Sequence, residues 1–192
     1  MYGKSGEKDN EVIDAHLAKL RKGAVVVNLG CGPNHQPLEN FARAVGKCQF
    51  KSTLIFADLS THQIQNNIWI PGPAKTKVVT LNAATATTIL GEGRVDLIVA
   101  LGLFGDLDST TTDEGTGKRA WPAVLRECLR LLKPLGELIV SNSCDRQPFE
   151  DFTAIAKEAG FTIAHHHISE AIWGREKPGD QRYLIVCLKH SN

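Results

Sequence analysis

The sequence has no long apolar run, almost no net charge and no paired cysteines. No stretch approaches the roughly 20 apolar residues that a membrane-spanning helix needs, and the opening MYGKSGEKDN is too polar for a signal peptide. The formal net charge of +1 excludes a strong overall attraction to nucleic acid or to an anionic membrane. Five cysteines without a CxxC pair favour free thiols in a reducing compartment. We therefore expect a cytoplasmic protein that does not bind membranes.

What the sequence does contain is the ordinary composition of a globular protein. It has 192 residues, of which 42% are hydrophobic and 22% charged. A chain of this length can bury one substantial core, and we find no internal repeat or linker that would divide it. We expect a single domain over residues 1–192, with residues 1–10 flexible.

Short apolar runs alternate with segments of helical periodicity. The expected strands are 24–29, 53–57, 77–81, 95–101, 137–141, 162–168 and 183–188. The expected helices are 11–21, 38–45, 62–69, 86–90, 121–132 and 148–159. Asp9 or Asn10 would cap the first helix, and Gly160 would close the last. This order predicts an α/β fold with a Rossmann-like, doubly wound, mostly parallel seven-stranded sheet. No helix separates the last two strands, so a C-terminal antiparallel strand is expected.

One long turn-rich segment, residues 106–120, interrupts this pattern. A loop of that length within a compact domain is either a functional lid or simply mobile. The composition of this segment does not distinguish a lid from a mobile loop.

A glycine-containing turn follows the first expected strand. Gly30 and Gly32 would let the backbone turn sharply and approach a ligand closely, at the edge where open parallel sheets bind ligands. A dinucleotide fingerprint needs a third glycine where this chain has His35, so a nicotinamide cofactor is disfavoured. Taken alone, the motif is also compatible with a tight turn that binds nothing.

An acidic residue ends the second expected strand. The Asp58 carboxylate could accept two hydrogen bonds from the vicinal hydroxyls of a ribose. The alternative is that Asp58 caps the following helix, a role for which Ser60 or Thr61 would serve equally well. Two ligand-binding features at neighbouring strand ends favour a nucleoside ligand more than either does alone.

With these motifs in place, the sequence resembles the class I S-adenosylmethionine-dependent methyltransferases from about Val25 to Leu188. VVNLGCGPN is similar to the family's first motif, FADLS to its second, and VTLNAAT to the end of its third strand. VDLIVALGLF resembles its fourth strand, and LRECLRLLKPLGELIVS resembles its fifth strand with the preceding helix. The resemblance implies S-adenosyl-L-methionine as cofactor and S-adenosyl-L-homocysteine as product.

The resemblance also implies roles for particular positions. Backbone at Gly30, Cys31 and Gly32 would pack against the methionine portion of the cofactor. Asp58 would bind the ribose and Leu59 would contact the adenine. The remaining implied contacts are Asn82 with the adenine amino group, Ala83 beside it, and Leu101 and Gly102 beneath the transferred methyl.

Two positions depart from the family pattern. The family usually has an acid where this chain has Asn28, and often a third alternating glycine where it has Asn34. Asn28 can form hydrogen bonds but cannot neutralise an ammonium group, so the sequence leaves open whether cofactor affinity is reduced. This departure keeps open a second interpretation, in which the chain is a cofactor-binding but non-catalytic partner of another methyltransferase.

Acceptor-side groups are expected after the fourth, fifth and sixth strands. The candidates for catalysis are Asp106, Asn142 and His167, with His167 as a possible general base. Other polar or aromatic groups lie nearby in sequence: Phe104, Asp108, Ser143, Asp145, Ser169, Glu170 and Trp173. The run His165-His166-His167 does not indicate a metal site, because adjacent strand residues point to opposite faces and no further ligand has a familiar spacing.

The range of expected methyl acceptors is limited mainly by motifs that the sequence lacks. The Asn/Asp-Pro-Pro-aromatic run of nucleic-acid amino methyltransferases is absent after the fourth strand, and so is the Pro-Cys nucleophile of cytosine C5 enzymes. We expect a small-molecule acceptor, with protein or RNA as alternatives. Transfer of another group, such as aminopropyl, also remains open, and the oligomeric state is not indicated.

Overall fold

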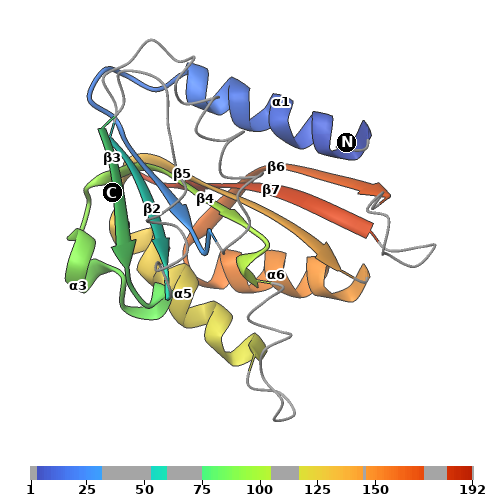
Figure 1. Ribbon diagram of the computed structural model, residues 1–192. Helices are drawn as coiled ribbons and strands as arrows, with labels where there is room; N and C mark the ends of the chain where they lie inside the picture. Colours follow the sequence, from blue (N-terminus) through green and yellow to red (C-terminus); the bar gives the residue numbers. More distant parts are fainter. Residues whose placement is uncertain are drawn as a thin grey trace.

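A computed structural model gives the fold (Figure 1). It describes residues 4–31, 53–59, 75–104, 117–144, 146–170 and 181–191. The expected helices 38–45 and 62–69 lie outside these residues.

Seven strands form one sheet in the order β3-β2-β1-β4-β5-β7-β6. Their bounds are β1 Val25–Leu29, β2 Thr53–Asp58, β3 Lys75–Thr80, β4 Val95–Leu101, β5 Leu132–Cys144, β6 Phe161–Glu170 and β7 Gln181–Lys189. Strands β1 to β5 pair in parallel, and β7 pairs antiparallel with both β5 and β6. The predicted α/β fold with a C-terminal antiparallel strand is confirmed. The carboxyl ends of β1, β2 and β4 consequently meet at one edge of the sheet.

Helices cover both faces of the sheet (Figure 1). Helix α1 (Lys4–Ala18) packs Ile13 and Leu17 on one face, against a cluster that includes Val26 and Phe56. Helices α5 (Gly117–Leu131) and α6 (Arg146–Glu158) cover the other face, where they enclose the larger core cluster. A short 3-10 helix, η1 (Ala83–Thr85), and helix α3 (Thr87–Leu90) join β3 to β4. Burial on both faces explains why the central strands are apolar runs without alternation.

The first helix begins earlier than its sequence pattern predicts. Helix α1 starts at Lys4, so Asp9 and Asn10 lie inside it, and the expected N-cap there was wrong. Only the later part of the helix carries the apolar spacing, because that part holds Ile13 and Leu17 against the sheet. Polar residues can extend a helix that packing has fixed elsewhere, and no proline stops it. The apolar spacing therefore indicates the buried turns of α1 rather than its first residue.

Strand β5 differs from the prediction at its beginning. It starts at Leu132 rather than at residue 137, and the residues just before Glu137 form an irregularity within the strand. Val95 pairs with Leu132 whereas Leu97 pairs with Glu137, so β5 carries three extra residues at this point. Leu135 has a φ of 64°, the backbone conformation of a turn. A bulge of this kind keeps the strand paired while it absorbs the turn.

Helix α5 also begins before the predicted start. It includes residues 117–120, which the sequence assigned to the end of the turn-rich loop, and it tolerates Pro122 in its interior. The rest of that loop, 105–116, lies outside the described residues. Among the described helices, none has the length and apolarity required to cross a bilayer.

Candidate functional site

The glycine turn after β1 is docked on the end of β2. Gly30 has a φ of 68°, and its N–H donates to the Ala57 carbonyl at 2.8 Å; the Cys31 N–H reaches the same oxygen at 3.4 Å. A β-carbon added at Gly30 would lie 2.6 Å from Cδ1 of Leu103, beyond the end of β4. The turn therefore needs glycine both for its backbone angle and for its contact with Leu103. Gly32 lies outside the described residues.

The acidic residue of β2 lies beside this turn. Burial and, to a smaller extent, the nearby Asp58 carboxylate, which repels a thiolate, together raise the pKa of the Cys31 thiol to about 12. That effect requires the carboxylate to be close to the turn. The next residue, Leu59, is 68% exposed, so an apolar side chain stands in solvent beside a half-buried acid. This pair suits the ribose and the base of a nucleoside.

Asn28 is a buried polar side chain at the same edge. It is 2% exposed and pairs in register with Phe56 of β2 and Val99 of β4, both fully buried. Its Oδ1 has no hydrogen-bond partner within the described part of the chain. A buried carbonyl oxygen without a donor costs stability unless something supplies that donor. The ammonium group of an amino-acid ligand could do so.

The segment after β3 is held by backbone and side-chain hydrogen bonds. The Leu81 N–H donates to the Asp58 carbonyl at 2.9 Å, which ties the end of β3 to that of β2. Asn82 is exposed and caps η1, with its Oδ1 accepting from the Ala84 N–H at 2.9 Å. An amide oxygen has two lone pairs, so this cap leaves one for a ligand amino group. Ala83 is the first residue of η1 and packs on the core.

Beyond β4 the backbone leaves room for a ligand. Leu101 is half-buried, and Gly102 has a φ of 85° with its N–H bonded to the Ser141 carbonyl at 2.7 Å. A β-carbon at Gly102 would meet no described atom within 4 Å. The family resemblance implied both residues as cofactor contacts, but it gave no sign that Leu103 would lie against Gly30.

Of the candidates for catalysis, Asn142 lies near the carboxyl end of β4, whereas His167 lies farther along the sheet. Asn142, 5% exposed, lies on β5 next to Tyr183. His167 lies on the outermost strand β6, paired with Leu184. Strands β5 and β7 separate it from β4, a distance of about 14 Å at the usual strand spacing. Asp106 lies outside the described residues.

Phe104 belongs to the core rather than to a ligand site. Its ring packs edge-on against Trp121 and Phe152, and the Trp121 indole N–H donates to the Phe104 carbonyl at 3.0 Å. All three side chains are fully buried. Its expected place among the acceptor-side groups was therefore wrong.

Neither a metal-binding cluster nor a disulfide is present among the described residues. Within the described residues, no group of three or more His, Cys, Asp or Glu side chains could hold a metal ion. Cys31, Cys128 and Cys187 are free thiols, and burial raises the pKa of each one. Buried thiols of raised pKa are poor nucleophiles.

Comparisons with known proteins identify the fold. No family model matches the chain, and a search of curated proteins finds no similar sequence. Among solved structures, an S-adenosylmethionine-dependent methyltransferase from Methanosarcina mazei is similar, with 14% identity, 90% of this chain and 95% of that chain covered, and a TM-score of 0.62. A geranyl diphosphate methyltransferase in complex with S-adenosylmethionine has 14% identity, coverages of 95% and 84%, and a TM-score of 0.64.

A third similar structure is the 4+2 cyclase SpnF, with 15% identity, coverages of 95% and 82%, and a TM-score of 0.64. Its reaction differs from that of the two methyltransferases, so the shared architecture does not by itself determine the reaction. What it does determine is the chain's structural class. The chain has the fold of the class I S-adenosylmethionine-dependent methyltransferases.

Proposed function

We propose that this protein binds S-adenosylmethionine and transfers its methyl group to a small-molecule acceptor. The observation that carries the proposal is the meeting of two features at one edge of the sheet. The Gly30 turn is bonded to the end of β2, and the Asp58 carboxylate that follows lies close enough to raise the pKa of Cys31.

The described residues fit the parts of this cofactor. Asp58 would accept from the ribose hydroxyls, with Leu59 against the adenine and Asn82 accepting from its amino group. Asn28 Oδ1 would accept from the ammonium group, which supplies the donor that this buried oxygen lacks. Leu101 and the open side of Gly102 would lie next to the sulfur end. When bound, the cofactor supplies an electrophilic methyl group.

The protein's part in the reaction is then to hold the acceptor in line with that methyl group. Asn142, on β5 beside β4, could orient a polar acceptor by hydrogen bonding. His167 is about three strand spacings from β4, so a role as general base requires the acceptor to extend across the sheet. The net charge of +1 supports a small acceptor over nucleic acid.

Calorimetric titration with S-adenosylmethionine and S-adenosylhomocysteine tests the binding step. We expect both to bind, and Asp58→Asn to weaken binding by about tenfold or more, since hydrogen bonds to a charged group are worth about 1.5–3 kcal/mol. Asp14→Asn, at an exposed acid on α1, is the matched control and should bind as the wild type does. Failure of the wild type to bind either compound would refute the proposal.

The transfer step needs a separate measurement. Turnover with an acceptor library should release S-adenosylhomocysteine, whereas aminopropyl transfer would not. The neutral Asn28 favours one alternative, a cofactor-binding partner without catalysis. Tight binding with no product from any acceptor would support that alternative.

A variant at Asn28 distinguishes a ligand-binding amide from a structural one. Asn28→Asp should tighten S-adenosylmethionine binding, because an anion would face the ammonium group. The same change should destabilise the free protein, because it buries a charge between Phe56 and Val99. Asn28→Leu should weaken binding without that loss of stability. If wild type, Asn28→Asp and Asn28→Leu bind S-adenosylmethionine with equal affinity, Asn28 does not contact the ligand.

A further inference from the structure

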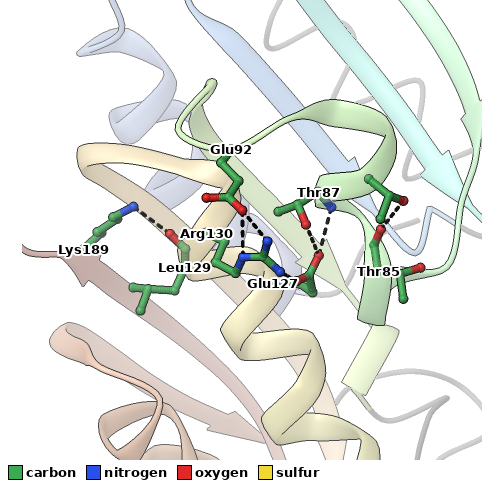
Figure 2. A network of polar contacts seen from close by, with 8 residues as sticks. Thr85, Thr87, Glu92, Glu127, Leu129, Arg130 and Lys189 are labelled. Carbon is green, nitrogen blue, oxygen red and sulfur yellow. Dashed lines mark hydrogen bonds and ion pairs between the residues drawn. The ribbon is translucent and has the colours of Figure 1, made fainter.

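A buried carboxylate on α5 contacts the segment that carries the expected adenine contacts. Glu127 is 6% exposed, and its Oε2 accepts from both the Thr87 N–H at 2.9 Å and the Thr87 hydroxyl at 2.6 Å. Its Oε1 accepts from Arg130, which in turn binds Glu92 (Figure 2). We call Glu127, Thr87, Arg130 and Glu92 the Glu127 cluster.

The cluster serves a helix end that has no cap of its own. Thr87 begins α3, and the residue at the N-cap position, Ala86, offers no side-chain acceptor. The Glu127 carboxylate supplies that acceptor from a different helix, 40 residues away in sequence. Burial alone would raise the pKa of Glu127, but the Thr87 hydrogen bonds and Arg130 outweigh it, and the pKa is lowered. The carboxylate is thus held ionised.

Thr87 lies close in sequence to the expected adenine contacts. Asn82 caps helix η1, which begins at Ala83 and ends at Thr85. Only Ala86 separates this helix from Thr87. The other end of this segment is tied to Asp58 through the Leu81 N–H. Helix α5 also packs against η1. The segment 82–86 is therefore held at one end by β2 and at the other by Glu127.

We propose that Glu127 is a positioning residue for adenine recognition, because it fixes Thr87 and through it the placement of Asn82 Oδ1. This rests on the proposed function, since it concerns the base of the same cofactor. Glu127 touches no ligand itself. Loss of its bonds to Thr87 should loosen the segment, so the hydrogen bond to the adenine amino group weakens more than the contacts to ribose and methionine.

The test compares two ligands that differ only at that amino group. S-adenosylhomocysteine and its purine analogue, in which hydrogen replaces the adenine amino group, are titrated calorimetrically into each protein. Wild type should prefer the adenosyl compound, and Glu127→Gln should reduce that preference about threefold to tenfold, the range of one hydrogen bond. Thr87→Val should reduce it in the same direction, and Thr87→Ser, which keeps the hydroxyl, should restore it.

Glu92→Gln is the matched control, because it breaks the Arg130 pair but leaves the Glu127 bonds to Thr87 in place. It should keep the wild-type preference. If Glu127→Gln weakens both ligands by the same factor, Glu127 is merely structural and the inference is overturned. The same holds if the wild type binds both ligands equally. If the wild type binds neither, the proposed function fails as well.

Discussion

Gly30 and Gly23 both have a positive φ, but only Gly30 has a neighbour that an added methyl group would strike. Leu103 Cδ1 lies 2.6 Å from the β-carbon position of Gly30, whereas nothing lies within 4 Å of that of Gly23. Alanine substitutions at the two positions can therefore distinguish the cost of backbone strain from the cost of a steric collision.

Gly30→Ala should lower the free energy of unfolding by about 2–5 kcal/mol, the sum of a left-handed residue and an overpacked contact. Gly23→Ala carries the backbone cost alone and should lose about 1–2 kcal/mol. Urea denaturation measures both values. Adding Leu103→Ala to Gly30→Ala should recover part of the loss; no recovery would mean that Leu103 is not the obstacle.

The ionised state of Glu127 predicts a dependence of stability on pH. Its pKa in the folded protein lies below the ordinary value of 4.5. The stabilisation is therefore complete above that value and is lost as pH falls through the lower folded pKa. The stability difference between wild type and Glu127→Gln should shrink from pH 6 to pH 3 in chemical denaturation. A difference that grows on acidification would contradict the lowered pKa.

At the scale of elements, α5 is fixed at its carboxyl end by the last strand. The Lys189 ammonium of β7 donates to the Leu129 and Leu132 carbonyls at 2.8 and 2.7 Å (Figure 2 shows the first). The Gly93 N–H donates to the Arg130 carbonyl at 2.8 Å. Carbonyls at a helix end lack partners within the helix, so these donors satisfy them.

Lys189→Met keeps most of the aliphatic stem but removes the ammonium group and both of its hydrogen bonds. It should cost about 1–3 kcal/mol, the usual effect of leaving acceptors at a helix end without a charged donor. Lys157→Met, at an exposed lysine on α6, is the control and should stay within about 0.5 kcal/mol of wild type. Thermal unfolding followed by circular dichroism measures both. Equal melting temperatures would show that water replaces the ammonium without loss.

The positions of the elements were predictable wherever burial imposes a pattern. Strand β4 has the predicted bounds, because both of its faces are covered and its residues are apolar except for Asp96. The start of α1 and the bulge in β5 were not predictable, since tertiary pairing rather than local composition determines them. The places of Gly30 and Asp58 at the ends of β1 and β2 were predictable, because each comes at the end of an apolar run in the sequence. The contact of Leu103 with Gly30 and the burial of Glu127 require coordinates.

At the scale of the whole molecule, ligand binding should be visible as a gain in stability. S-adenosylhomocysteine at 100 times its dissociation constant should add about 2.7 kcal/mol. For a chain of 192 residues that corresponds to a rise in melting temperature of about 5–10 °C. Asp58→Asn at the same ligand concentration should show a smaller rise. An unchanged melting temperature for wild type would contradict binding at this edge.

The position of β7 between β5 and β6 bears on how the chain is made. Translation produces β6 before β7, yet β6 joins the sheet only through β7. Until residues 181–189 leave the ribosome, the nascent chain exposes one side of β5 and a strand with nothing to pair with. Chaperones that bind extended segments would find their target here during synthesis.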